Sequence, residues 1–191
     1  MRVTMIGIGV ILLGTIHSVS AFAATAEHAT ATGPLKNHDD AVINAFEVMC
    51  TLEPENFEHI SARAQAMVMR KSVDKTEKQS PDITRHLEVF EGNLTTGPFS
   101  LLLEKISGPT INATNCGVAS NTPNKRAYFD DIVRTLHLSQ NTSKRTGSNG
   151  NTVTTWDNVY GPHTFLDLTD LRGSDGVLVQ LLDASAKSEK P

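Results

Sequence analysis

Aromatic residues and cysteines are scarce in this chain: Phe, Trp and Tyr make up 5% of its 191 residues, and cysteine occurs twice. So few cysteines exclude a scaffold held mainly by disulfides, and 13 Gly and 8 Pro without a regular period exclude a collagen-like protein. No apolar run after the N-terminal region approaches the roughly 20 residues that a membrane-spanning helix requires. The composition therefore predicts a soluble globular protein of mixed helix and strand.

Positive charge is also sparse. The formal net charge is −4, and adjacent basic residues form isolated pairs with few aromatic side chains nearby, at Arg70 and Lys71, Lys125 and Arg126, and Lys144 and Arg145. Surfaces that bind DNA or RNA combine larger basic patches with aromatic side chains. We expect these pairs to be solvated surface, and we expect no nucleic-acid partner.

The N-terminus carries the features of an export signal. An arginine near the start precedes the apolar stretch Met5–Leu13, and Ala21-Phe22-Ala23 has the small-x-small pattern that signal peptidase reads. We predict that residues 1–23 are a signal peptide cleaved after its last residue, with a second candidate site after Ala26. An uncleaved membrane anchor is the alternative, although the apolar stretch is short for a membrane span.

The first cysteine, Cys50, lies too far from the apolar stretch to be a lipidated residue. We therefore expect no stable membrane insertion after signal cleavage. These features predict a periplasmic or secreted protein.

A single domain is predicted between two irregular ends. Residues 24–38 are mostly small or polar and lack periodicity, so we interpret them as a disordered leader. Residues 184–191 are small and charged, which predicts a flexible tail. The segment 39–183 is long enough for one hydrophobic core and too short for two, so we predict one α+β domain there.

Three amphipathic segments predict helices. The first begins with Asp39 or Asp40 as its N-cap, the second begins near Pro54, which suits a first helical turn, and the third follows Thr122 and Pro123. Their apolar stripes are Val42, Phe46, Met49 and Cys50 in the first, Phe57, Ile60, Ala64, Met67 and Val68 in the second, and Phe129, Ile132, Val133 and Leu136 in the third.

Apolar runs between turn signals predict strands at 86–90, 99–106, 115–120, 152–159, 164–171 and 177–182. The polar segments Arg70–Asp82 and Ser139–Asn151 are predicted to be loops, the second either mobile or functional. In the last hairpin, alternation places on one side the residues Leu166, Leu168, Val177, Val179 and Leu181.

The order of these elements favours an α+β fold. We expect an antiparallel sheet of about five to six strands, with two N-terminal helices and one mid-chain helix packed on one face.

Several of these features occur together: a signal peptide, Cys50 at the end of the first helix, a strand with Cys116-Gly117-Val118, an amphipathic helix after it, and a strand with Trp156 before the final hairpin. In this combination the chain resembles a loosely defined group of small exported proteins of proteobacteria without assigned activity. The resemblance implies a bacterial host and a periplasmic location, and it implies no catalytic residue.

Cys50 and Cys116 are expected to form a disulfide, because exported proteins meet oxidising conditions and neither cysteine lies in a C-x-x-C or metal-ligand spacing. Two buried free thiols are one alternative. A catalytic Cys50 paired with a histidine is another, although no reactive-cysteine signature surrounds it.

His163 and Asp167 are the candidate catalytic pair. They are four positions apart where a strand is predicted to begin, so they can face the same side as a base and its orienting carboxylate. An exposed strand face without catalytic function is the alternative. The sequence contains no zinc-binding H-x-x-x-H or H-E-x-x-H spacing, no G-x-S-x-G, no glycine-rich phosphate motif and no calcium loop. We therefore expect no metal and no cofactor.

Trp156 is the only Trp in the chain. It is expected to fill the core with its indole N–H on one acceptor, or to form a ligand platform beneath the polar segment 139–151. Three glycosylation sequons begin at Asn93, Asn112 and Asn141, and they matter only if the protein is secreted by a eukaryote.

Taken together, the residues predict a non-enzymatic exported module that binds a small ligand or an envelope protein. A hydrolase-like enzyme that uses His163 and Asp167 is the alternative.

Overall fold

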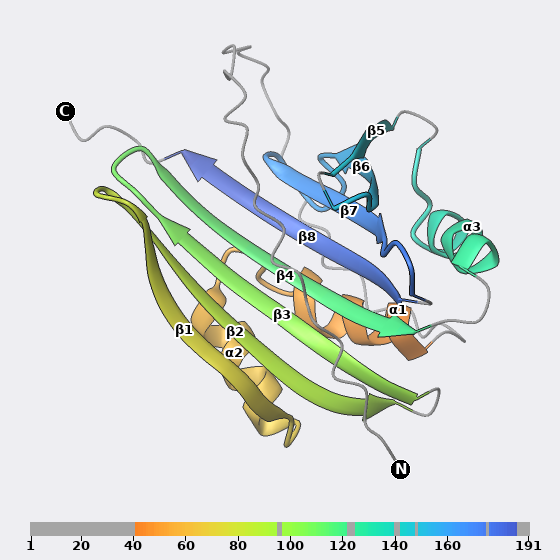
Figure 1. Ribbon diagram of the computed structural model, residues 1–191, viewed down its shortest axis with the longest axis horizontal. Coiled ribbons are helices and arrows are strands. Elements are labelled where there is room, and N and C mark those ends of the chain that lie inside the picture. Colours follow the sequence, from red (N-terminus) through yellow and green to blue (C-terminus); the bar gives the residue numbers. More distant parts are fainter. Residues whose placement is uncertain are drawn as a thin grey trace.

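A single antiparallel sheet of eight strands dominates the protein (Figure 1). The computed structural model describes residues 41–94, 97–121, 125–139, 142–147, 149–174 and 176–186. The strands lie in the order β1-β2-β3-β4-β8-β7-β6-β5. Their bounds are β1 Arg70–Ser80, β2 Ile83–Leu94, β3 Gly97–Ser107, β4 Ile111–Asn121, β5 Ser143–Thr146, β6 Thr152–Asp157, β7 Thr164–Asp170 and β8 Gly176–Ala186. Two meanders, β1–β4 and β5–β8, therefore meet where β4 pairs with β8.

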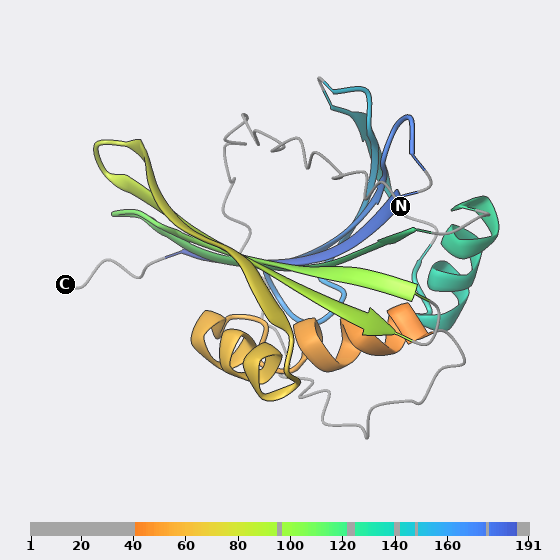
Figure 2. The same ribbon diagram turned by 60° about the horizontal axis from the view of Figure 1, so that its bottom comes forward.

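The helices at the start of the described chain cover one face of the sheet. They are α1 (Ala41–Phe46), the π-helix η1 (Glu47–Thr51) that continues it, and α2 (Phe57–Ala66). Figure 2 shows α1 and α2 on one side of the sheet, while the β1–β2 turn and β5 rise on the opposite side. The fourth helical element, α3 (Lys125–Thr135), lies beyond one end of the strands.

The expected sheet of five to six strands, with two N-terminal helices and one mid-chain helix on one face, is wrong. The structure has eight strands of up to 12 residues, and α1 has only six residues before it becomes a π-helix. Two of the strands come from segments expected to be loops: β1 from Arg70–Asp82 and β5 from Ser139–Asn151.

Both of these strands are sheet edges, which explains why hydrophobic patterning misses them. Almost every residue of β1 is exposed, and all four residues of β5 are. An edge strand is held by its backbone hydrogen bonds to one neighbour, so its side chains can remain charged and solvated. In β1 this pairing with β2 runs from Arg70 opposite Glu91 to Ser80 opposite Ile83.

Helix α2 differs from the expectation at both ends. It starts at Phe57, because Asn56 is the N-cap and its side-chain oxygen accepts the N–H of His59 at 3.1 Å, so Pro54 lies outside the helix. It ends at Ala66, and the two final residues of the expected apolar stripe are exposed, Met67 to 52% and Val68 to 90%.

Other predictions are confirmed. The first-helix residues Val42, Phe46, Met49 and Cys50 are all buried, and so are the hairpin residues Leu166, Leu168, Val177, Val179 and Leu181. Helix α3 exists where its apolar stripe predicts it, with Ile132 fully buried. Cys50 of η1 and Cys116 of β4 form the expected disulfide, which fastens the helical layer to a central strand.

Several predictions lie outside the described residues: the signal peptide, the leader, the caps at Asp39 or Asp40 and at Thr122, and most of the C-terminal tail. Among the residues that are described, no helix is long and apolar enough to cross a membrane.

Candidate functional site

The structure does not bring His163 and Asp167 together as a catalytic pair. His163 is exposed in the turn before β7, with a φ of 67°. The Asp167 carboxylate accepts hydrogen bonds from Thr155 at 2.5 Å and from Arg145 at 3.1 Å. Within the described chain Asp167 is thus part of a strand-to-strand contact, and no hydrogen bond or ion pair joins it to His163.

Trp156 lies in the hydrophobic core with 4% of its surface exposed. Its indole N–H donates to the carbonyl of Ser139 at 2.9 Å, where the polar segment begins. This position matches the expected core residue and leaves little ring surface for a ligand. Two of the sequon asparagines, Asn93 of β2 and Asn112 of β4, are exposed, and Asn141 lies outside the described residues.

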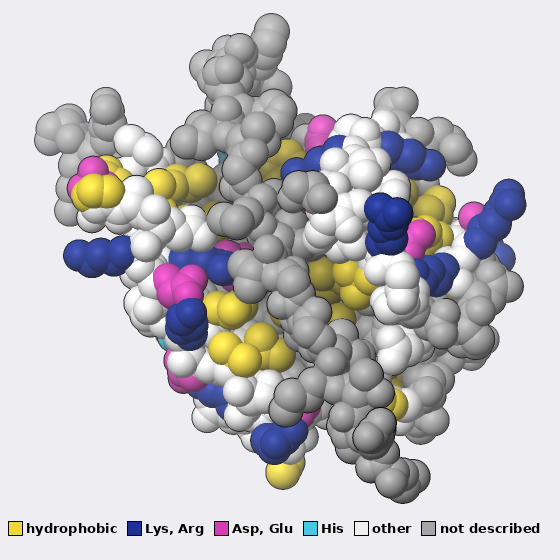
Figure 3. Space-filling model, viewed as in Figure 1, with side chains coloured by type: hydrophobic (Ala, Val, Ile, Leu, Met, Phe, Trp, Pro, Cys, Tyr) yellow, Lys and Arg dark blue, Asp and Glu magenta, His cyan; other side chains and the backbone are white. Residues whose placement is uncertain are grey.

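The face of the sheet opposite α1 and α2, here called the helix-free face, is unexpectedly apolar. Strand register places on it Leu87, Val89, Leu102, Ile106, Ala113, Val153, Phe165, Leu178 and Leu182. Figure 3 views this face and shows hydrophobic side chains over β2 and β3 and over β4 and β8, with charged side chains toward β1. Leu87, Leu102 and Leu182 are half-buried there. Val89, Ala113, Val153 and Leu178 of the same face are buried, so its accessible apolar surface comes from the half-buried residues. Apolar patches that remain accessible are typical of interaction surfaces.

A polar network is set into the same face. Arg85 of β2 donates from Nε to Glu104 of β3, and the Nδ2 group of Asn115 donates to the other carboxylate oxygen at 3.3 Å. The side chains of Arg85 and Glu104 are each only 12% exposed. On the same face, two buried side-chain oxygens, Asn115 Oδ1 and Thr169 Oγ1, have no hydrogen-bond partner among the described residues. A buried oxygen without a partner costs about 1–3 kcal/mol.

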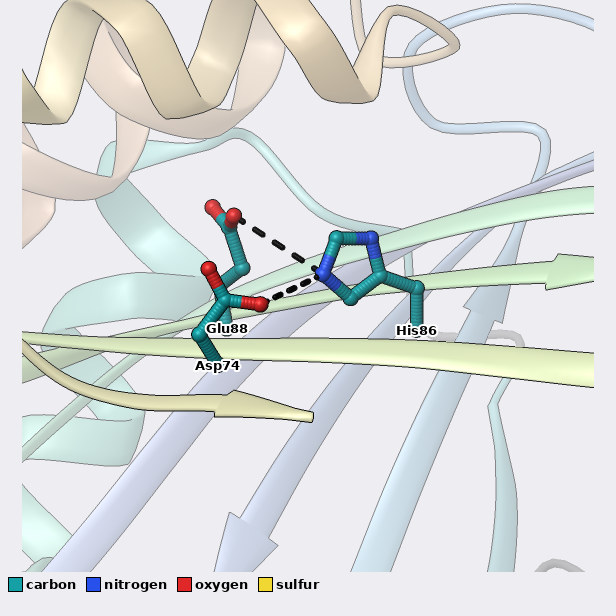
Figure 4. Close-up of side chains that lie close together, drawn as sticks. All are labelled: Asp74, His86 and Glu88. Carbon is teal, nitrogen blue, oxygen red and sulfur yellow. Dashed lines mark hydrogen bonds and ion pairs between the residues drawn. The ribbon is translucent and has the colours of Figure 1, made fainter. Parts of the chain in front are cut away.

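A second site lies between α2 and the first two strands. Asp74 of β1 and His86 and Glu88 of β2 place their ligand atoms within 4.8 Å of one another. In Figure 4 the imidazole and both carboxylates point toward a common centre on the helix side of the sheet. His86 Nε2 is 2.9 Å from Asp74 Oδ1 and 3.8 Å from Glu88 Oε1. We call these three residues the Asp-His-Glu cluster.

Lys71 contacts both carboxylates of the Asp-His-Glu cluster. Its ammonium group donates to Glu88 Oε1 at 2.5 Å and to Asp74 Oδ2 at 3.0 Å. The hydrogen bond to Glu88 raises the pKa of Lys71 above its usual value. The contacts of Asp74 with His86 and then with Lys71 hold the pKa of the Asp74 carboxyl below its usual value. The cluster is therefore organised around a positive charge.

Side chains of helix α2 orient two residues of the cluster, Glu88 and His86. Ser61 donates a hydrogen bond to Glu88 Oε2 at 2.6 Å and in turn accepts one from Gln65 at 3.3 Å. The Phe57 ring lies against the His86 ring with centroids 4.9 Å apart. These contacts fix the orientation of one carboxylate and one imidazole, which is how neighbouring groups orient metal ligands.

Sequence reasoning missed this cluster because it assigned Asp74 to a loop. One signal was present, since His86 and Glu88 are two positions apart and so face the same side of a strand. The third ligand depends on the register that pairs Asp74 with Glu88, and local sequence does not specify that register.

Comparisons with protein-family models, curated proteins and solved structures give no match for this chain.

Proposed function

We propose that this protein is a non-enzymatic binding module, exported to an oxidising compartment such as the bacterial periplasm, that holds an envelope protein on its helix-free face. The N-terminal signal sequence, the resemblance to small exported proteins of proteobacteria and the Cys50–Cys116 disulfide support the compartment.

The single observation that carries the binding role is the composition of the helix-free face. An aliphatic surface extends over strands from both meanders. A partner that covers this face would remove its half-buried leucines from water.

A polypeptide fits this surface better than a small molecule. The half-buried apolar residues extend from β2 to β7, through Leu87, Leu102, Leu182 and Phe165, so they form a broad surface. Small ligands bind mostly in concave sites that enclose them, whereas broad apolar patches are typical of protein interfaces. The hydrolase alternative has less support, because Asp167 is held by Thr155 and Arg145.

Photo-crosslinking in living cells of the host tests this proposal. A photoreactive amino acid is placed at Leu102 and, separately, at Leu182, both half-buried on the helix-free face. The matched control carries it at Val68, which is 90% exposed at the end of α2. We expect both face positions to capture the same envelope protein, and we expect Ile106→Asp to abolish the capture without unfolding the chain.

Other outcomes overturn the proposal. Adducts only to another segment of the same chain would show that the face is covered internally. An adduct with the mass of a small molecule would identify a ligand site instead. Capture of the same proteins from Val68 would show that the crosslinks are nonspecific.

A further inference from the structure

We propose that the Asp-His-Glu cluster is a binding site for a divalent transition metal ion of the first row, with Zn²⁺ as the preferred ion. The ammonium group of Lys71 occupies the site when no metal is bound. The site is separate from the helix-free face and lies on the other side of the sheet.

The donor set favours zinc over harder cations. One imidazole nitrogen and two carboxylate oxygens suit Zn²⁺ and its neighbours, whereas Mg²⁺ and Ca²⁺ prefer ligand sets made of oxygen. Three protein ligands also leave a coordination position open for water.

The spacing of the donors fits a shared ion. Around a metal with bonds of about 2.1 Å, neighbouring ligand atoms lie roughly 3.0–3.4 Å apart. The distances from His86 Nε2 to Asp74 Oδ1 and to Glu88 Oε1, 2.9 and 3.8 Å, bracket this range. The longer distance, from His86 to Glu88, must shorten by about 0.4 Å to enter this range.

Charge and burial also support a cation. Glu88 is 4% exposed, and one of its oxygens is already fixed by Ser61, which leaves the other to face the centre of the cluster. With a neutral imidazole, the two carboxylates and Lys71 give the cluster one net negative charge. A divalent ion that displaces the Lys71 ammonium group changes this net charge to zero. The Lys71 side chain is 29% exposed, so its ammonium group can move into water.

Metal binding requires a defined change at His86. Its contact with Asp74 places a proton on Nε2, because a carboxylate oxygen can only accept. To ligate the metal through Nε2, the neutral imidazole must carry its proton on Nδ1 instead. No redox step occurs, and the protein neither gains nor loses a proton if Lys71 stays charged.

Calorimetric titration of the untagged full chain with Zn²⁺ tests the proposal. We expect one ion per chain, no heat with Mg²⁺, and a switch of the His86 proton from Nε2 to Nδ1 in ¹H–¹⁵N NMR spectra. Asp74→Asn and His86→Ala are expected to weaken zinc binding by about tenfold or more. Lys71→Met is expected to tighten it by about tenfold, because the competing ammonium group is gone.

The control is His59→Ala. His59 Nδ1 contacts Glu53 at 2.8 Å beside the same helix, but that exposed pair has one carboxylate fewer. The His59→Ala variant should therefore bind zinc with the same affinity as the unaltered chain. The proposal fails if the unaltered chain does not bind zinc, if Lys71→Met binds no more tightly, or if His59→Ala loses as much affinity as His86→Ala. If Lys71→Met does not fold, the Asp74→Asn titration and the His86 spectrum decide.

Discussion

Removing the Cys50–Cys116 disulfide should cost this protein a large part of its stability. The bond closes a loop of 66 positions and joins the π-helix η1 to β4, which lies between β3 and β8. The chain-entropy relation gives about 4 kcal/mol for a loop of this length. The free energy of unfolding of a domain is roughly 5–15 kcal/mol in total, so the loss is severe.

The assay compares three samples: the oxidised chain, the reduced chain, and the double variant Cys50→Ala with Cys116→Ala. Both cysteines are at most 1% exposed, so the alanine variant also loses packing, whereas the reduced chain keeps both sulfur atoms. We expect melting temperatures about 8–16 °C below that of the oxidised chain for a loss of this size.

Denaturant unfolding then distinguishes an effect of the bond on the unfolded chain from an effect on the native state. If the bond acts by restricting the unfolded chain, its removal lets that chain expand, and the m value should rise as stability falls. A reduced chain that unfolds within about 1 kcal/mol of the oxidised one would refute the reasoning. A large loss with an unchanged m value would show that the bond acts in the native state instead.

Three further predictions follow from local geometry. Val68 follows the C-cap of α2 with a φ of 58°, and Val68 N–H and Met69 N–H donate to the carbonyls of Gln65 and Ala64. Val68→Gly should therefore raise the free energy of unfolding in urea by about 0.5–1 kcal/mol, and a decrease would contradict this. Burial, with a smaller effect of Glu47, raises the pKa of Tyr160, so the folded state holds the proton longer than the unfolded state. Stability should therefore be full below about pH 10 and fall above it, and in melting curves against pH, Tyr160→Phe should remove that fall. His163→Ala should change the free energy of unfolding by about 0.5 kcal/mol, and Asp167→Ala should lower it by about 1 kcal/mol through its lost contacts. Loss of a measured activity in either variant, with the fold intact, would support the hydrolase alternative.

The sequence predicts well the elements whose apolar residues repeat with the period of their structure. Periodicity of this kind predicts helix α3, the inward face with Cys50, and the hairpin of β7 and β8. The disulfide follows from pairing two cysteines in a chain that is predicted to be exported. In each case burial of one face determines the structure, and burial is what a hydrophobic pattern records.

Prediction fails where the backbone or a distant residue determines the structure. Strand β1 is held by its backbone pairing with β2, so its side chains can be charged and exposed. Those side chains therefore lack the hydrophobic alternation that would predict a strand. Helix α2 starts at Phe57 because the Asn56 side chain caps it, although Pro54 is an acceptable first residue. The Asp-His-Glu cluster depends on the β1–β2 register, and the helix-free face depends on six strands that local sequence does not align.

The strand order has a consequence for how the chain folds. Strand β8 is the last strand of the described residues, and its eleven residues lie inside the sheet, between β4 and β7. A truncated chain that lacks β8 would leave two separate four-stranded and three-stranded pieces, each with a long unpaired edge open to other chains. The β1–β4 meander can pair with local contacts, but the complete sheet forms only after β8 has been made. During synthesis, native pairing of the two meanders must therefore wait for β8.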